Sequence, residues 1–249
     1  MQEKSKRIRI MAGPNGSGKS TILKSVRNSF YSGPFVNADD IEKSFQDKKL
    51  VNIAAEYGIT IQDSDFTSYF IQQGQSWITK AKQENSNIGI ICKNGVLVTD
   101  SNPSPHDAAL AADFIRYELL KKGETFTFET VLSHPSKIEF LKESNKLGFK
   151  NYLYFICTVS PDINIDRVIQ RVKLGGHDVP VDKIRNRYHE SLKCLPKIIA
   201  QCYRCYFFDN SSETQSIEPI AIIDANKTFK MIANQVPWWL QKYVIDSLY

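Results

Sequence analysis

A glycine-rich segment near the start of the chain constrains the fold more than any other feature of the sequence. It fits the pattern G-x-x-x-x-G-K-[ST] in full, and its residues are Gly13, Pro14, Asn15, Gly16, Ser17, Gly18, Lys19, Ser20 and Thr21. A short β-type run over 7–12 precedes it, and apolar residues at helical spacing follow it to about residue 28. Glycines between a strand and a helix let successive N–H groups turn inward at the positive end of the helix dipole. The segment therefore predicts a phosphate-binding loop.

Two side chains of this loop have the chemistry that a nucleoside triphosphate requires. Lys19 is expected to bridge the β- and γ-phosphates, and the Ser20 hydroxyl is expected to hold Mg²⁺. The predicted cofactors are therefore ATP or GTP with Mg²⁺. Kinases, GTPases and ATPases all use such a loop, so other residues must decide the reaction.

Strands alternate with helices along most of the 249 residues, in a chain that is 42% apolar and 24% charged. Strands are expected at 7–12, 35–38, 125–130, 152–159, 206–208 and 220–223, and helices at 105–122, 136–147, 161–174, 180–200 and 236–248. This alternation predicts an α/β fold, a mainly parallel sheet with helices on both faces. Residues 44–104 are predicted as a helical insertion, although Gly89–Val98 also fits a β-hairpin that turns at Asn94-Gly95.

Carboxylates follow two of the predicted strands. Asp39 and Asp40 lie at the carboxyl end of the second strand, where ligands gather in open parallel sheets. A carboxylate there can accept the proton of an attacking hydroxyl, so Asp39 is the predicted base, and Asp40 is expected to cap the following helix. Glu129 and the adjacent Thr130 end the strand over 125–130. We expect Glu129 to hold a substrate hydroxyl or to order Mg²⁺ through water.

Arginines gather on two predicted helices over about 161–200. Arg167 and Arg171 are four residues apart and share a helix face, while Arg185 and Arg187 lie on the next helix. The helices are joined by a glycine-containing segment, Gly175–Pro180. A helix pair of this kind predicts a lid that brings positive charge to a transferring phosphoryl group.

Four motifs in this order resemble those of the zeta-toxin family of P-loop kinases, in the branch once called predicted ABC-type ATPases. They are Ala12–Thr21, Asn37-Ala38-Asp39-Asp40-Ile41, Phe128-Glu129-Thr130-Val131-Leu132-Ser133, and Gly175–Pro180 followed by Arg187-Tyr188 and Ser191-Leu192. The resemblance covers about residues 7–210. It implies one P-loop kinase-like domain over 1–249, with a helical insertion at about 44–104 and a lid at about 161–200.

The resemblance also implies an activity and site roles. It implies ATP- or GTP-dependent phosphorylation of a small-molecule hydroxyl on a nucleotide sugar, UDP-N-acetylglucosamine, with a toxin-like effect on cell-wall synthesis. By motif, Asp39 matches the general base, Glu129 with Thr130 the substrate site, and Arg171 the first lid arginine. The second lid arginine is Arg185 or Arg187, and Asp209-Asn210-Ser211 resembles the loop beside the nucleotide base.

Two other functional classes fit parts of the sequence. A P-loop ATPase or nucleotide-binding protein without kinase activity needs an apolar strand that ends in Asp-Glu, but the candidate Val96–Asp100 is followed by Ser101. A nucleic-acid-binding module has only the net charge of +5 and Trp238-Trp239 in its favour, and these tryptophans fit core packing better.

The expected partners are therefore a small-molecule substrate and a separate antitoxin protein, without nucleic acid or membrane. The five cysteines are odd in number and, apart from Cys202-x-x-Cys205, far apart, which indicates reduced thiols and a cytoplasmic protein.

Overall fold

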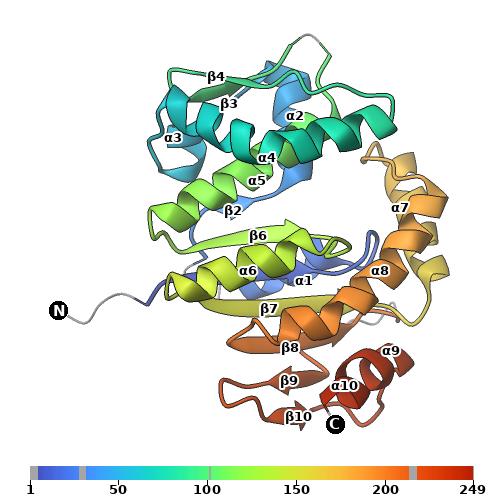
Figure 1. The fold of residues 1–249 in the computed structure, drawn as a ribbon. Coiled ribbons are helices and arrows are strands. Elements are labelled where there is room, and N and C mark those ends of the chain that lie inside the picture. The colour runs from blue at the N-terminus through green and yellow to red at the C-terminus, as the bar shows by residue number, and fades with distance from the viewer. Residues whose placement is uncertain (1–4, 28–31, 101, 213–217, 249) are drawn as a thin grey trace. The chain divides into compact units, whose positions relative to one another are not determined.

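The computed structural model describes residues 5–27, 32–100, 102–212 and 218–248 (Figure 1). The chain divides into two compact units. The first unit combines Met1–Ser32 with Glu129–Tyr249, and the second is Gly33–Phe128. No helix in the described ranges is long and apolar enough to cross a membrane.

The first unit is built on a twisted sheet whose central strands are parallel. Strands β1 (Arg7–Ala12), β7 (Lys150–Cys157) and β8 (Arg204–Asp209) pair in parallel, with β7 in the middle. Strands β9 (Ala221–Ile223) and β10 (Phe229–Met231) extend the sheet antiparallel beyond β8. Leu153, Phe155 and Ile156 of β7 are fully buried, as expected for a parallel strand that is covered on both faces.

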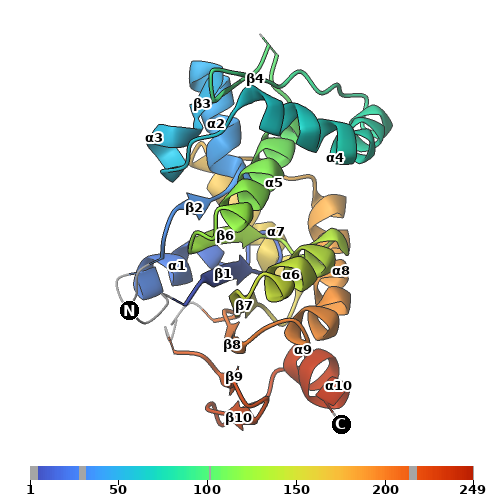
Figure 2. The same cartoon turned by 60° about the vertical axis from the view of Figure 1, so that its left-hand side comes forward.

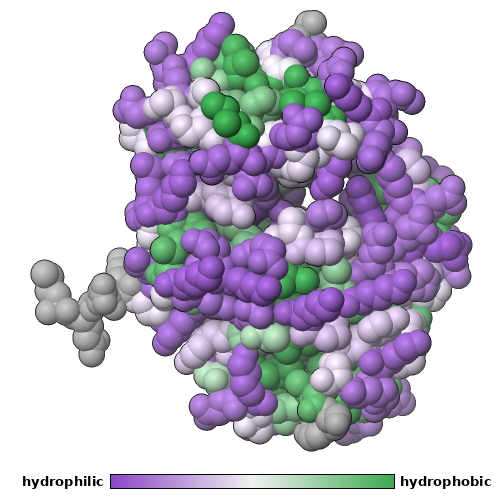
Figure 3. Space-filling view, viewed as in Figure 1, coloured by the Kyte–Doolittle hydropathy of each residue, from purple (hydrophilic) through white to green (hydrophobic). Residues whose placement is uncertain are grey.

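Helices cover both faces of this sheet. Helix α1 (Lys19–Arg27) lies on one face, and α6 (Ser136–Lys146) and α8 (Val181–Ile199) lie on the other (Figure 2). Helix α7 (Pro161–Lys173) pairs with α8 to form the helical hairpin that was predicted as a lid. The chain ends in α9 (Trp238–Leu240), the π-turn η1 (Gln241–Ile245) and α10 (Asp246–Leu248). The outer surfaces of α6 and α8 are mainly hydrophilic (Figure 3).

The second unit holds a short parallel strand pair and a small sheet of its own. Strand β2 (Phe35–Val36) pairs in parallel with β6 (Phe126–Thr130), whose last two residues belong to the first unit. Strands β3 (Leu50–Asn52), β5 (Val96–Val98) and β4 (Ile91–Lys93) form an antiparallel sheet in that order. The helices are α2 (Ala38–Lys48), α3 (Ile53–Tyr57), α4 (Asp63–Gln83) and α5 (Pro105–Lys121).

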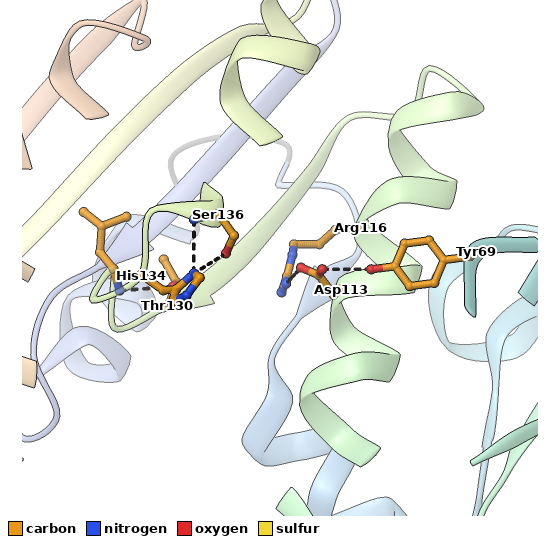
Figure 4. Close-up of polar contacts among 7 residues, drawn as sticks. Tyr69, Asp113, Arg116, Thr130, His134 and Ser136 are labelled. Atoms are coloured by element: carbon orange, nitrogen blue, oxygen red, sulfur yellow. Dashed lines mark hydrogen bonds and ion pairs between the residues drawn. The ribbon is translucent and has the colours of Figure 1, made fainter. Parts of the chain in front are cut away.

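A polar cluster joins α4 to α5 inside the second unit. The Tyr69 hydroxyl donates to Asp113 Oδ2 at 2.8 Å, and the Arg116 guanidinium pairs with the other oxygen of Asp113 (Figure 4). Arg116 also lies over the Phe128 ring, 5.2 Å from its centroid. Burial, and then the Asp113 charge, raise the pKa of Tyr69 well above its usual range. The pair thereby keeps a buried arginine neutralised beside β6.

The predicted fold class is confirmed, and two local expectations are wrong. Residues 44–104 are not only helical, because they contain the sheet β3-β5-β4. The β4–β5 hairpin does form, with Asn94 at φ 51° and Gly95 at φ 73°, the pair of positive angles that a primed turn requires. Asp40 does not cap α2. Asn37 takes that position, and its Oδ1 accepts the Asp39 N–H at 3.0 Å.

Candidate phosphate-binding and phosphotransfer site

The phosphate loop connects β1 to α1, and neighbouring backbone packs tightly against its glycines. Gly16 and Gly18 have φ angles of 76° and 93°, which residues that carry a side chain rarely adopt. A Cβ atom on Gly16 would lie 2.4 Å from the Asn164 carbonyl oxygen of α7, and one on Gly18 would lie 2.1 Å from Asn210 Nδ2. The glycines therefore provide both the backbone angles and the space that the loop needs.

Lys19 is held beneath the loop by two backbone carbonyls and a carboxylate. Its Nζ donates to the carbonyl oxygens of Gly13 and Pro14 at 2.9 and 3.0 Å, and it lies 3.7 Å from Glu129 Oε1. The Lys19 side chain is 7% exposed and that of Glu129 is 14% exposed. Screening by water is therefore weak, and the carboxylate stabilises the buried ammonium. The structure thus brings together two of the predicted site residues, Lys19 and Glu129.

Thr130, the next residue, anchors the start of the loop through its backbone. The Thr130 carbonyl oxygen accepts the Gly13 N–H at 3.3 Å, and its Oγ1 accepts the Leu132 N–H at 3.1 Å. Leu132 has a φ of 64°, so the chain turns sharply after β6. His134 Nδ1 continues this turn by accepting the Ser136 N–H at 3.2 Å (Figure 4). Thr130 therefore contacts the phosphate loop, in addition to its predicted role in substrate binding.

Asn210 is a site residue whose role at the phosphate loop was not predicted. Its Nδ2 donates to the Ser17 carbonyl oxygen at 2.8 Å, and its own carbonyl accepts from Arg167 Nη1 at 2.7 Å. Its N–H donates to the Cys157 carbonyl at the end of β7. Asn210 thereby ties the loop to β7 and to α7. The segment Asp209–Ser211 was singled out only as a loop beside the nucleotide base, and spacing along the sequence gives no signal for this long-range contact.

A second buried asparagine fixes α7 over the loop. Asn164, fully buried in the first turn of α7, accepts the Thr158 hydroxyl at 2.6 Å through its Oδ1. The Tyr188 hydroxyl of α8 donates to the Thr158 carbonyl oxygen at 2.6 Å. Both helices of the α7–α8 hairpin are thus anchored to the segment that follows β7.

Arg171, the predicted first lid arginine, lies on the face of α7 that Asn164 occupies. The two residues are seven apart, which returns a helix to nearly the same face after about two turns. Arg171 Nη2 donates to the His177 carbonyl oxygen at 2.7 Å, and its side chain passes over Gly176. A Cβ atom on Gly176 would lie 2.6 Å from Arg171 Cγ, so the glycine leaves room for this path.

The two candidates for the second lid arginine differ in their surroundings. Arg185 Nη2 lies 2.9 Å from Asp162 Oδ1, in an exposed ion pair between α8 and α7. Asp162 and Arg171 are nine residues apart, which places them on opposite faces of α7 by helical geometry of about 100° per residue. Arg187 is half-buried and lies on the other flank of α8, beyond the buried Ile184 and Tyr188.

Asp39, the predicted base, belongs to the second unit. It lies in the first turn of α2, directly after β2, and its side chain is exposed. Within the second unit the register pairs Phe35 with Thr127 and Val36 with Phe128, so β2 and β6 run in the same direction there. Burial, and then the charge of Asp39, raise the pKa of the neighbouring Asp40.

The loop also fits a magnesium-bound nucleotide. Ser20 is exposed in the first turn of α1, where the N–H groups have no partner within the helix. The buried Ser17 Oγ has no hydrogen-bond partner among the described residues. Among all the residues that the structure describes, no group of three or more His, Cys, Asp or Glu residues could hold a metal. A Mg²⁺ ion that is held by one hydroxyl and the phosphates fits this donor set.

The strand that an ATPase assignment would use lies elsewhere. Val96–Val98 is β5, which pairs antiparallel with β3 and β4 in the small sheet of the second unit. Asp100 accepts the Asn102 N–H at 2.9 Å within a local turn. In a P-loop ATPase the corresponding aspartate ends a strand of the parallel sheet. The geometry therefore does not support that assignment of Asp100.

Comparisons with known proteins find few sequence relatives. No protein-family model matches the sequence. An uncharacterised protein of Haemophilus influenzae (strain ATCC 51907 / DSM 11121 / KW20 / Rd) is 33% identical over 82 residues, which are 33% of this chain and 59% of that protein. The match is too short to give this chain a family.

Solved structures show a clearer likeness. A chain in the crystal structure of AvrRxo1-ORF1:AvrRxo1-ORF2 with sulphate ions has a TM-score of 0.55 at 15% identity, over 91% of this chain and 61% of that chain. The same complex with ATP gives 0.53 at 16% identity, over 91% and 60%. This chain spans about three-fifths of the length of these relatives. A chain of the PezAT toxin-antitoxin system of Streptococcus pneumoniae gives 0.49 at 11% identity, over 98% and 80%. At these identities the likeness to the AvrRxo1 structures establishes the fold alone, a mainly parallel sheet with helices on both faces, as expected from the sequence.

Proposed function

We propose that this protein is a P-loop kinase that transfers the γ-phosphoryl group of ATP to a hydroxyl of a small molecule. One observation carries the proposal. The first turn of α7 packs directly on the phosphate loop, at Asn164 and Gly16, and this contact supports a role for the arginines of α7 at the terminal phosphates of a bound nucleotide. A protein that only binds nucleotide needs no cationic lid at this place. A similar structure that was solved with ATP supports ATP as the donor.

Each side chain has a proposed role in the transfer. Asp39 accepts the proton of the attacking hydroxyl, and Lys19 exchanges its contacts with Gly13, Pro14 and Glu129 for contacts with the phosphate oxygens. Arg171 and Arg187 stabilise the negative charge that develops on the transferred group. Mg²⁺, held at Ser20, would neutralise charge on the β- and γ-phosphates. Glu129 is released from Lys19 by the nucleotide and becomes available to a substrate hydroxyl.

The acceptor that the motif resemblance supports is a nucleotide sugar such as UDP-N-acetylglucosamine. The same resemblance supports a toxin-like role in the cytoplasm and a separate antitoxin protein as partner. The test is incubation with γ-labelled ATP, Mg²⁺ and a panel of nucleotide sugars, with labelled products separated and identified. We expect the label on a sugar hydroxyl, and none in a matched reaction with the Lys19→Ala protein.

Two other results of this assay would change the proposal. Label on a nucleoside or on another small molecule would keep the kinase and replace the acceptor. Rapid release of inorganic phosphate, with no acceptor present and no labelled product from any panel member, would support the P-loop ATPase instead.

The two lid arginines give a matched comparison. Arg187→Ala should lower kcat by about 100-fold or more, because an arginine on the transferred phosphoryl group contributes strongly to its transition state. Arg185→Ala should change kcat by less than about threefold, since it removes an exposed ion pair with Asp162, and such pairs contribute about 0–1 kcal/mol. Steady-state kinetics on both variants tests this, and the reverse order of effects would move the role to Arg185.

A further inference from the structure

The first unit carries a surface that phosphotransfer does not use. Strands β1, β7 and β8 present one face to the side of the sheet on which α1 lies (Figure 2). The register places Arg9 beside Tyr152, and Tyr152 beside Arg204. The next row places Tyr154 beside Tyr206. Side chains of a strand alternate between faces, so these five residues share one face.

The two ends of this sheet face differ in composition. At the carboxyl ends of the strands, Met11, Ile156 and Phe208 are buried on the side of α1. At the amino ends, the face consists of cations and tyrosines. We call it the basic tyrosine face, and its residues are Arg7, Arg9, Lys150, Tyr152, Tyr154, Tyr203, Arg204 and Tyr206. Arg9 and Tyr154 are buried, at 4% and 7% exposure, and support the other six, which are partly or fully exposed. Within the part of the first unit that the structure describes, α1 is the helix on this side of the sheet.

Aromatic and cationic side chains alternate across the basic tyrosine face. The rings of Tyr154 and Tyr206 stack with their centroids 4.9 Å apart, and those of Tyr152 and Tyr203 meet edge to face at 5.5 Å. Lys150 Nζ lies 4.6 Å from the centroid of Tyr203. The rings are thereby fixed in place, which lowers the entropy lost when a planar ligand binds.

Cations occupy the same face. Arg9 lies over Tyr152 at 5.8 Å, and Arg204 Nη1 donates to the Tyr206 hydroxyl at 3.5 Å. Arg204 Nε is buried and has no hydrogen-bond partner among the described residues. Every charged side chain that these three strands place on this face is a cation. Lys230 of β10 extends the row beyond Tyr206, because Ile222 of β9 pairs with both residues. The face is therefore complementary to a chain of negative charges.

We propose that the basic tyrosine face binds single-stranded nucleic acid. Arg7 and Lys150 lie on neighbouring strands, about 4.8 Å apart, and Arg204 lies on the strand beyond them, so these cations can follow a phosphate backbone. The partly exposed rings of Tyr152, Tyr203 and Tyr206 offer stacking surfaces to unpaired bases. An acidic peptide would satisfy the cations but would make no use of the three partly exposed aromatic rings. A duplex would keep its bases stacked on one another and away from those rings. Single strands therefore match both features of the face.

This site is separate from the phosphate loop. The loop begins at Gly13, at the carboxyl end of β1, whereas Arg7 and Arg9 lie six and four residues earlier, about 20 and 13 Å along an extended strand. Bound ATP therefore leaves the basic tyrosine face open. Charges that are scattered through the sequence meet here only because parallel strands from distant segments lie side by side. The sequence alone accordingly predicted no nucleic-acid partner.

The test is fluorescence anisotropy of a labelled 15-nucleotide oligouridylate with the full chain, in excess ATP and Mg²⁺ to occupy the phosphate loop. We expect binding that weakens at least tenfold in the Lys150→Glu, Arg204→Glu double variant. The matched charge reversal Lys193→Glu, Lys197→Glu on α8 should weaken binding less than twofold. The salt dependence should also flatten in the first variant, by about 0.7 in log–log slope for each phosphate that the protein no longer neutralises.

A second pair of variants tests the rings. Tyr152→Leu and Tyr203→Leu should each weaken binding about fivefold or more and leave the salt slope unchanged, since base stacking is worth about 1–3 kcal/mol per base. Lys150→Gln with Arg204→Gln replaces the double reversal if thermal melting shows that the reversal unfolds the protein.

Several results would overturn the proposal. One is unchanged affinity in the strand variants, and another is equal binding of a duplex of the same length. Loss of binding when ATP is added would place the oligonucleotide at the phosphate loop. If polyglutamate displaces the oligouridylate when both supply the same concentration of negative charges, the face would instead be a surface for an acidic protein.

Discussion

Replacing Asp39 with asparagine should lower the rate of phosphoryl transfer by about 10²–10⁴-fold, the range that a positioned general base contributes. Nucleotide affinity should stay within about twofold, because the phosphate contacts come from the loop and α1. Asparagine keeps the size of the side chain but cannot accept a proton. The N-cap of α2 is Asn37, so the helix start does not depend on the Asp39 side chain. Single-turnover transfer from labelled ATP, with nucleotide affinity by calorimetry, separates the two effects.

Asp40 provides the matched control for this variant. Asp40→Asn removes the same charge one residue further along α2, at a similar cost at the helix N-terminus of about 0.3–1 kcal/mol. We expect it to keep transfer within about threefold of the parent. The Asp39 charge raises the pKa of Asp40, so Asp39→Asn should also lower that pKa, which carboxyl NMR can follow. Full transfer by Asp39→Asn, with loss in Asp40→Asn, would assign the base to Asp40.

Local patterns made much of this fold predictable from the sequence. The phosphate loop was predictable because its glycines, Lys19 and Ser20 lie within nine residues. Asn94-Gly95 gave the β4–β5 hairpin for the same reason, since its positive φ angles depend on those two residues alone. The bounds of α7 and α8 were set by Pro161, Gly175 and Pro180, which are starting and stopping residues of helices.

Contacts between distant segments were not predictable in this way. Asn210 reaches the carbonyl of Ser17, 193 residues away, and neither residue type signals the pairing. Strand β3 is three residues long and pairs with β5 across more than forty residues, so it carries too little periodicity to detect. The start of α2 was misplaced because Asn37 and Asp40 are both good capping residues, and only the extended backbone at Asn37 decides between them.

Gly16→Ala should abolish nucleotide binding, with affinity lowered at least 100-fold, because the added methyl group meets backbone that cannot move aside. The new Cβ atom would lie 2.4 Å from the Asn164 carbonyl oxygen, and Thr158 holds the Asn164 side chain at 2.6 Å. Helix α7 is thus fixed, and the loop must shift. The loop would then aim its N–H groups away from the phosphates. Calorimetry with ATP and Mg²⁺, together with thermal unfolding, measures both effects.

Gly148→Ala is the control that separates backbone strain from collision with α7. Gly148 has a φ of 80°, close to that of Gly16, yet a Cβ atom there would have no neighbour within 4 Å. Both substitutions therefore impose a positive φ on alanine, which costs about 1–2 kcal/mol of unfolding free energy. Gly148→Ala should show that loss and bind nucleotide like the parent. If Gly16→Ala also binds nucleotide like the parent, then α7 is free to move. The contact between α7 and the phosphate loop would then not be rigid, and it could not support the proposed phosphotransfer.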